Sequence, residues 1–328
     1  MNRRILGITG VWAMMAVSLA SVVDLALAQS WPTRPIRLMV PFVAGGSSDI
    51  VARAVGVRMQ ESLGQTVIVD NRPGANGAIA AQLLSKANPD GYTFMVGSIG
   101  VFAINVALFK DLAYDPLRDF DLLTVAVRTP NVLITSQKVS ATSVKELVGL
   151  LQKNPGKLTF VSSGTGSSDH LSAELFWQRT NTTGIHVPYK GGAAAMADMI
   201  GGQVDASFQN LGAATGHIKA GRLRALAVTG DRRAPQLPDV PTMIELGFGG
   251  FEVYSWQAFT APRGLPKDVR NRLEGAIVGA LKLPQLRQSM DDLGFEVVAS
   301  TSAQFETFLK AEIARWRQVV QTANVKPD

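Results

Sequence analysis

The sequence predicts an α/β protein built from two similar lobes with a ligand cleft between them. Strand-like runs of branched residues alternate with amphipathic helical segments, the pattern of mostly parallel sheets covered by helices. The tetrapeptide GSSD also occurs twice, at 46–49 and 166–169, each time after an apolar run and before a helix-like segment. The copies lie about one domain length apart, so we expect each lobe to present one such loop to the cleft.

The individual elements follow from hydrophobic periodicity. Runs of branched and aromatic residues predict strands at 36–42, 66–69, 92–96, 131–135, 157–162, 184–187, 204–208 and 223–229. Apolar residues at helical spacing predict helices at 50–64, 78–88, 144–154, 170–180, 266–281, 284–293 and 302–322, with a short strand-like stretch at 295–300.

Two long apolar stretches, at 120–135 and 250–262, are the candidate connections between the lobes. If one of them crosses out and the other returns, the first lobe is discontinuous in sequence. We therefore expect lobe 1 to comprise residues 29–127 plus 250–328, and lobe 2 to comprise residues 128–249. The 328 residues are enough for two domains of ordinary size, each with its own core.

The amino terminus has the parts of a cleaved secretory signal. Arg3 and Arg4 precede a long apolar run, and small residues lead up to Ala28. We expect residues 1–28 to be a signal peptide removed after Ala28, which places the mature protein in the bacterial periplasm. A retained membrane anchor is the alternative. The sequence has no cysteine, which excludes disulfides, thiol catalysis and a lipidated amino-terminal cysteine.

The two loops of glycine and serine are candidate anion sites. The first N–H groups of a helix have no partner within the helix, and the helix dipole places partial positive charge there. Glycine allows a tight turn and a close approach to the backbone, and hydroxyls can donate to a ligand or cap the helix. The loops supply these groups as Gly45, Gly46, Ser47, Ser48, Gly164, Thr165, Gly166, Ser167 and Ser168. The alternative is a pair of well-capped helices with Asp49 and Asp169 in their first turns.

A carboxylate suits these loops better than a phosphate does. The sequence contains no GxxxxGK[ST] motif, and residues 164–169 lack the third glycine of GxGxxG. Asp49 and Asp169 would also repel a polyphosphate more strongly than a single carboxylate. One loop in each lobe therefore predicts a small dicarboxylate that spans the cleft.

Residues that carry catalytic or metal chemistry are scarce. The sequence has no GxSxG or HExxH motif and three histidines, so we expect no catalytic residue, no metal and no cofactor. His170, in the helix after the second loop, either packs against that loop or contacts the ligand. Asp205 is interpreted as a strand-end carboxylate that holds the loops by hydrogen bonds. The net charge of +6 is scattered, so nucleic acid is a poor partner.

Several longer motifs run in order from Trp31 to beyond Pro262. They include WPTRPIRLMVPFVAGGSSDIVAR, VIVDNRPGANGAIAA, FVSSGTGSSDHLSAELF, HVPYKGGAAAMADMIGGQVDASF and SWQAFTAP. Together they resemble the Bug receptors, the extracytoplasmic solute-binding proteins of tripartite tricarboxylate transporters. The resemblance implies a two-lobed periplasmic binding protein type II fold, monomeric, that closes on its ligand and delivers it to inner-membrane permease subunits. It also implies ligands such as dicarboxylic amino acids, citrate-like acids and aromatic carboxylates.

The resemblance also implies which residues bind the ligand. In that family the two loops grip a carboxylate through backbone amides and ordered water. Carried over, this role falls to Ala44, Gly45, Gly46, Ser47, Asp49, Ser163, Gly164, Thr165, Gly166, Ser167 and His170. The expected site further includes Phe42, Ser48, Ser98 and Asp205. Ser48 and Ser163 depart from the threonine and alanine frequent in the family. Candidate specificity positions are Ser98, Ile99, Gln209 and Asn210.

Two other classes of function remain as alternatives. The first is an exported serine hydrolase acting on a carboxylate-containing substrate, with a nucleophile among Ser162, Ser163, Ser167 and Ser168 and His170 as its base. The second is a cytoplasmic ligand-sensing regulator, since the same lobed fold serves as an effector domain. A regulator needs a DNA-reading module, and this sequence begins with a signal instead.

Overall fold

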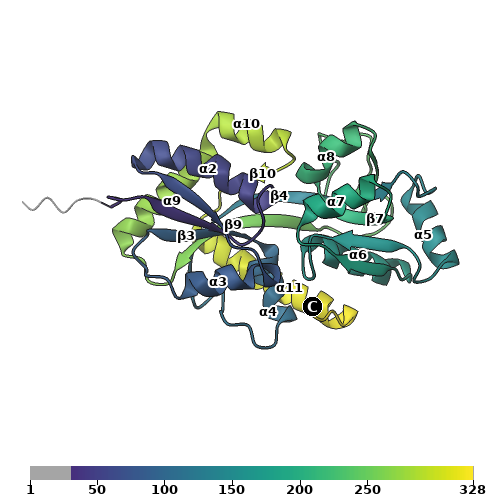
Figure 1. The fold of residues 1–328 in the computed structure, drawn as a ribbon, viewed down its shortest axis with the longest axis horizontal. Helices are drawn as coiled ribbons and strands as arrows, with labels where there is room; N and C mark the ends of the chain where they lie inside the picture. Colours follow the sequence, from purple (N-terminus) through teal and green to yellow (C-terminus); the bar gives the residue numbers. More distant parts are fainter. Residues whose placement is uncertain (1–30, 328) are drawn as a thin grey trace, which may run out of the picture.

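The computed structural model describes residues 31–327. The predicted signal peptide, residues 1–28, lies outside the described residues. The described chain forms a mixed α/β fold around one curled sheet of ten strands. Figure 1 shows two halves side by side, with the long strands β4 and β9 running between them. The first half contains the strands at 36–40, 67–71 and 93–98, and the second half contains those at 159–162, 185–188 and 206–210.

The strands match most of the predicted runs. They are β1 (Ile36–Val40), β2 (Val67–Asn71), β3 (Thr93–Ser98), β4 (Phe120–Ser136), β5 (Thr159–Ser162), β6 (Ile185–Pro188), β7 (Ala206–Asn210), β8 (Leu223–Val228), β9 (Tyr254–Pro262) and β10 (Glu296–Val297).

Seven of the helices match the predicted segments, whereas those at 105–108, 192–200 and 211–219 were not predicted. The helices are α2 (Ser47–Leu63), α3 (Ala78–Ser85), α4 (Asn105–Leu108), α5 (Val144–Lys153), α6 (Ser168–Thr180), α7 (Gly192–Ile200), α8 (Leu211–Lys219), α9 (Lys267–Lys282), α10 (Pro284–Asp292) and α11 (Ser302–Ala323). A 3-10 turn, η1 (Ala75–Gly77), precedes α3, and a π-helical turn, η2 (Gly100–Ile104), precedes α4.

The strand order is β2-β1-β3-β9-β4-β7-β5-β6, and β10 and β8 also pair with β4. Pairing is parallel among β2, β1 and β3 and among β6, β5 and β7. The expectation of mostly parallel sheets is correct within each half and wrong at the centre. There β9 is antiparallel to β3 and β4, and β4 is antiparallel to β7 and β8. A strand that crosses to the second half and one that returns run in opposite directions, so they pair antiparallel.

The two predicted connections are the strands β4 and β9. The first part of β4 pairs with β9 and β10, and its last part, from Asn131 to Ser136, pairs with β7 and β8. One continuous strand therefore belongs to the hydrogen-bonding networks of both halves. This arrangement links the halves through backbone that is hydrogen-bonded on both sides.

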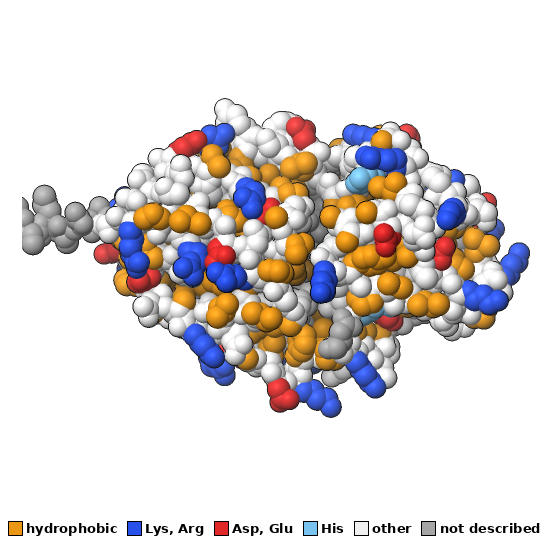
Figure 2. All heavy atoms as spheres, viewed as in Figure 1, with side chains coloured by type: hydrophobic (Ala, Val, Ile, Leu, Met, Phe, Trp, Pro, Cys, Tyr) orange, Lys and Arg blue, Asp and Glu red, His pale blue; other side chains and the backbone are white. Residues whose placement is uncertain are grey.

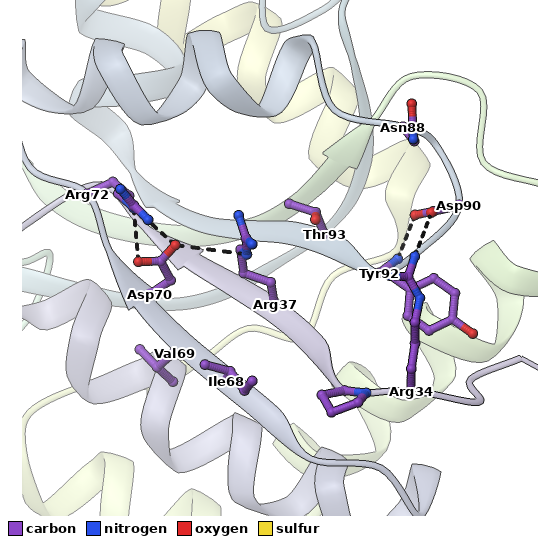
Figure 3. Close-up of a pocket in the computed structure, with 11 residues that line it drawn as sticks. Arg34, Arg37, Ile68, Val69, Asp70, Arg72, Asn88, Asp90, Tyr92 and Thr93 are labelled. Carbon is purple, nitrogen blue, oxygen red and sulfur yellow. Dashed lines mark hydrogen bonds and ion pairs between the residues drawn. The ribbon is translucent and has the colours of Figure 1, made fainter.

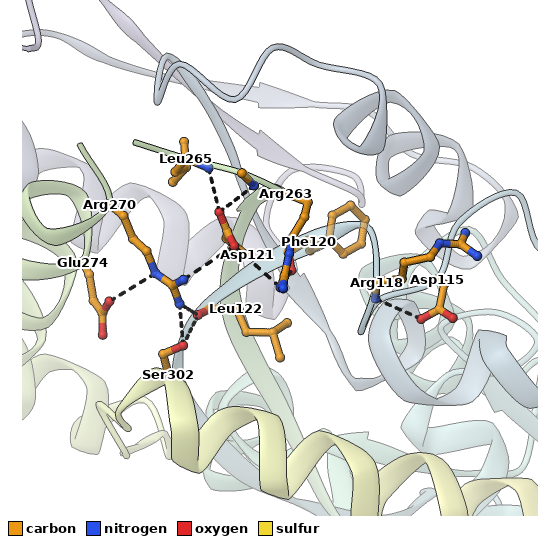
Figure 4. Close-up of polar contacts among 11 residues, drawn as sticks. Asp115, Arg118, Phe120, Asp121, Leu122, Arg263, Leu265, Arg270, Glu274 and Ser302 are labelled. Atoms are coloured by element: carbon orange, nitrogen blue, oxygen red, sulfur yellow. Dashed lines mark hydrogen bonds and ion pairs between the residues drawn. The ribbon is translucent and has the colours of Figure 1, made fainter. Parts of the chain in front are cut away.

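A polar network around the buried Asp121 fixes the start of β4 (Figure 4). The carboxylate of Asp121 accepts the N–H groups of Gly264, at 3.0 Å, and Leu265, at 2.8 Å. Arg270 lies 3.6 Å from the same carboxylate and donates to Ser302 Oγ at 2.7 Å. The network thus ties β4 to the turn after β9 and to the beginnings of α9 and α11.

Alternate residues of β1 enter different cores, as a strand requires. Leu38 and Val40 pack with α2 and α9, whereas Met39 packs on the other face with α3. A separate core in the second half joins Val132 and Ile134 of β4 to α7 and α8.

The face drawn in Figure 2 shows no concentration of one charge. In Figure 2 the Lys and Arg side chains on the visible face are spread over both halves, with Asp and Glu among them. Between residues 31 and 327, no helix combines the length and apolar character needed to cross a membrane.

Candidate functional site

A cleft of about 670 Å³ lies between the two halves. Its walls are loops that follow the carboxyl ends of strands: residues 42–48 after β1, 73–77 after β2, 163–165 after β5 and 189–193 after β6. The last residues of β3 and β7 also line it, as do Ser255 and Gln257 of β9. This is the edge at which open α/β sheets bind their ligands.

The first predicted loop is held by Asp49 in the first turn of α2. One carboxylate oxygen accepts the Gly45 N–H at 2.9 Å, and the other accepts Asn71 Nδ2 at 3.0 Å. Arg53, one turn along α2, donates to both oxygens at 2.9 Å. Burial alone would raise the pKa of Asp49, but the hydrogen bonds from Arg53, Gly45 and Asn71 hold it below its ordinary value. Asp49 therefore braces the loop from behind.

The second loop repeats this device with Asp169 in α6. The buried Asp169 carboxylate accepts the Ser163 N–H at 2.6 Å and the Ser163 hydroxyl at 2.7 Å, and Gln209 Nε2 lies 3.3 Å away. Ser167 caps the helix by accepting the His170 N–H. Burial raises the pKa of Asp169 against these hydrogen bonds. In both loops an aspartate from the helix thus orients the amides of the preceding turn.

The buried His170 pairs with the partly buried His186 beneath the second loop. The Nδ1 of His170 accepts the Gly166 N–H at 3.1 Å, and its ring stacks on His186 with the centroids 3.6 Å apart. Burial, followed by repulsion from His170, lowers the pKa of His186 to about 3. Of the two roles considered for His170, the structure shows contact with the loop.

Two further helix starts, which the physical reading of the sequence missed, also face the cleft. The loop before α7 contributes Tyr189 and Lys190, and the loop before α3 contributes Asn76. Lys190 supplies a cation that the two predicted loops lack. Both stretches, YKGG and PGANG, place glycine just before a helical segment, the pattern that identified the first two loops.

The walls of the cleft touch across it. Ser47 Oγ of the first half donates to Asn210 Oδ1 of the second at 2.9 Å. Asn76 Nδ2 donates to the Gly166 carbonyl oxygen at 3.0 Å. A Cβ atom on Gly166 would lie 2.6 Å from Leu108 Cδ2, so this glycine is a point of close contact between the halves.

Most of the predicted site residues lie together in the cleft. Those that line it are Phe42, Ala44, Gly45, Gly46, Ser47, Ser48, Ser98, Ser163, Gly164, Thr165 and Ser167. The four candidate specificity positions, Ser98, Ile99, Gln209 and Asn210, line it as well. Asp49, Gly166 and His170 stand behind the lining and support it through the contacts described above.

The structure places Asp205 away from the cleft, which corrects its expected role in holding the loops. It precedes β7 and accepts the backbone N–H and the hydroxyl of Thr159, at 2.8 and 2.9 Å. Because β5 and β7 are parallel, this contact lies at their amino ends, opposite the edge that carries the loops.

The serine and histidine contacts do not form a nucleophile and base open to the cleft. Ser162 Oγ lies 2.7 Å from His186 Nε2, but Ser162 is fully buried and does not line the cleft. His170, the base considered from the sequence, has its Nδ1 occupied by the Gly166 N–H. Ser162, His170 and His186 instead pack beneath the second loop and support it.

A second groove, of about 470 Å³, shares no lining residue with the cleft (Figure 3). Arg72 pairs with Asp70 at 3.0 Å and Arg34 with Asp90 at 3.3 Å, while Arg34 also lies over the Tyr92 ring. These arginines are engaged by carboxylates of the groove itself, so it holds little free positive charge for an anion.

Comparison with known proteins assigns the chain to a family. Residues 51–325 match the family model described as tripartite tricarboxylate transporter family receptor. Protein BugT of Bordetella pertussis is 35% identical over 324 residues, which cover 98% of each chain.

Solved structures agree with this assignment. Periplasmic binding protein BugD is 34% identical, with a TM-score of 0.85 over 90% of this chain and 99% of that one. Rpa4515 of R. palustris with adipate is 37% identical, with a TM-score of 0.87 over 91% of this chain and all of that one. MatC of Rhodopseudomonas palustris with bound malate is 31% identical, with a TM-score of 0.84 over 88% of this chain and all of that one. The chain therefore belongs to the tripartite tricarboxylate transporter receptor family and is a periplasmic solute-binding receptor, not an enzyme.

Proposed function

We propose that the cleft captures a small carboxylate between the helix starts of α2 and α6. The observation that carries this proposal is the matched pair of braced loops on opposite walls of one cleft. Asp49 and Asp169 each accept an N–H of their own loop. Their charges are thereby used within the protein, and the partial positive charge of each helix start is directed at the ligand.

The energies are sufficient for a useful affinity. A micromolar dissociation constant corresponds to about 8 kcal/mol. Charge-assisted hydrogen bonds contribute roughly 1.5–3 kcal/mol each. A few amide donors together with Lys190 could therefore provide this binding free energy, from which the cost of ordering the ligand is still to be subtracted. Two relatives described above, one with adipate and one with malate, support a carboxylate ligand.

Binding is coupled, in this proposal, to closure of two lobes. Lobe 1 consists of residues 29–127 plus 250–328 and lobe 2 of residues 128–249, with β4 and β9 as the connecting strands. The direct hydrogen bond from Ser47 to Asn210 supports this, since it joins the two lobes at the cleft. The closed receptor then delivers the carboxylate to inner-membrane permease subunits, acting as a monomer after cleavage behind Ala28.

Thermal unfolding of purified residues 29–328 tests the proposal. A ligand that binds the native state raises the midpoint, by an amount that grows with its concentration. We expect shifts with succinate, adipate, citrate or benzoate and none with glucose or spermidine. A shift with glucose or spermidine alone would reject a carboxylate site.

A paired variant separates specific binding from general salt effects. Gly46 lines the cleft, and a Cβ atom there would meet only the Val43 carbonyl oxygen, at 3.7 Å. Gly46→Val should therefore fold, yet lose the ligand-induced shift. Gly216 on α8, where a Cβ meets nothing within 4 Å, provides the control: Gly216→Val should keep the shift.

A further inference from the structure

One buried polar group in the cleft lacks a partner. Gln257 of β9 is 1% exposed and lines the cleft. Its Oε1 has no hydrogen-bond partner in the described part of the chain, and its Nε2 lies at 3.5 Å, a long distance, from Ser255 Oγ. Buried amides are nearly always hydrogen-bonded, so an unpaired one calls for an explanation.

The neighbours of Gln257 are polar as well. In the sheet register Ser98 at the end of β3 stands directly opposite Gln257. Ser255 lies two residues earlier on β9, hence on the same face of the strand. All three residues line the cleft. They form a polar patch, the floor patch, on the central strands between the two loop-bearing walls.

The chemistry of the floor patch suits a hydroxyl group. An amide presents a carbonyl acceptor and an N–H donor, and half a turn about its last bond exchanges them. A hydroxyl both donates and accepts, so it satisfies either orientation. A carboxylate can only accept, and Lys190, an exposed residue, is the one Lys or Arg among the cleft-lining residues within 31–327. An ionised group at the floor would therefore be buried without a counter-charge, which is costly.

We propose that Gln257, with Ser98 and Ser255, forms a subsite for a hydroxyl group of the ligand. The receptor then selects hydroxylated carboxylates over otherwise identical acids that lack the hydroxyl. This inference rests on the proposed function, because the loops bind the carboxylate of the ligand while the floor patch binds its hydroxyl group. Failure to pair a buried amide is what penalises the acid without the hydroxyl.

Matched pairs of acids test the inference by isothermal titration calorimetry. The pairs are succinate with malate, hexanoate with 6-hydroxyhexanoate, and 3-phenylpropanoate with 3-(4-hydroxyphenyl)propanoate. In at least one pair we expect the wild-type receptor to bind the hydroxylated acid about tenfold more tightly. In Gln257→Leu the preference should fall below twofold, while the acid without the hydroxyl binds as tightly as before or more tightly.

A matched control lies on the same strand. Thr260 Oγ1 is also buried and unpaired, but Thr260 does not line the cleft. Thr260→Val should keep the preference for the hydroxyl, and Gln257→Met provides a second variant if Gln257→Leu does not fold.

The outcomes separate this inference from the proposed function. If the wild-type receptor binds none of these acids and shows no thermal shift with adipate, citrate or benzoate, the proposed function fails, and the floor subsite fails with it. If it binds acids without preferring the hydroxylated member of any pair, only the floor subsite is rejected. Retention of the preference in Gln257→Leu and Gln257→Met would also reject it.

Discussion

The histidine pair beneath the second loop makes the stability of the protein depend on pH. His186 is stacked on His170 and lies 2.7 Å from Ser162 Oγ. Burial and, secondarily, the charge of His170 lower the pKa of His186 to about 3. In the unfolded chain the pKa of a histidine is about 6.5. Between these two values the unfolded chain binds a proton that the folded protein excludes.

The magnitude follows from the linkage between proton binding and folding. The unfolded state binds more protons below pH 6.5, so the free energy of unfolding falls by about 1.4 kcal/mol for each pH unit below that value. At pH 4.5 the contribution of His186 amounts to a loss of about 3 kcal/mol relative to pH 7. His186→Gln removes the titration and keeps an amide oxygen that can accept from Ser162. Its free energy of unfolding should therefore decline by about 3 kcal/mol less than that of the wild type.

Urea unfolding at pH 7.0, 6.0, 5.0 and 4.5 measures this difference. His217→Gln on α8 is the control. Burial and Arg222 also lower the pKa of His217, but less than the pKa of His186 is lowered. The control variant should follow the wild type closely. Equal pH dependence in the wild type and His186→Gln would refute the low pKa of His186. A titration of its ring protons by NMR with a midpoint near pH 6 would refute it directly.

Three more predictions concern the loops. Gly166→Val should lower the free energy of unfolding by more than about 2 kcal/mol in urea melts, because Gly166 has φ +79° and its Cβ would lie 2.6 Å from Leu108; wild-type stability would contradict this. Asp49→Asn should cost about 1–3 kcal/mol at pH 7. Hydrogen bonds lower the pKa of Asp49, and below that pKa the wild-type carboxyl group is protonated as well. The loss in free energy of unfolding caused by Asp49→Asn should therefore vanish there. A loss that persists at such low pH would show that the ion pair with Arg53 is not its source. Lys190→Met should weaken carboxylate binding several-fold in calorimetry at low salt and less at 0.5 M salt; an unchanged affinity would remove Lys190 from the site.

Local pattern predicted most of the elements, though not α4, α7 and α8, and the two loops, because these features do not depend on distant partners. The run at 36–42 contains β1, the run at 157–162 contains β5, and the long stretch at 120–135 is β4 to within one residue. An apolar run bounded by glycine predicts a buried strand regardless of which strands it pairs with. The pairing itself depends on partners far along the chain, and for this reason the antiparallel placement of β9 beside β3 is absent from the prediction.

Two residues that line the cleft, Gln257 and Lys190, are absent from the predicted site for different reasons. Gln257 stands in the strand-like run SWQAFTAP together with the polar residues Ser255 and Thr260. Only its register opposite Ser98 places Gln257 in the cleft. Lys190 had a usable signal, since YKGG combines a basic residue with the glycine turn before a helix. Applying the loop pattern to every glycine turn that follows a strand, instead of to the repeated tetrapeptide alone, would have found it.

Asp169 and Asp205 show how strand direction separates two residues that look alike in the sequence. Both are acidic residues beside strands of the second half, and both hold backbone N–H groups in the structure. Asp169 comes after β5, so it lies at the carboxyl edge and orients an amide that lines the cleft. Asp205 comes before β7, so it lies at the amino edge, where the same kind of hydrogen bond joins two strands far from any ligand. In a parallel sheet, an acidic residue that follows a strand is therefore a better candidate for a site than one that precedes it.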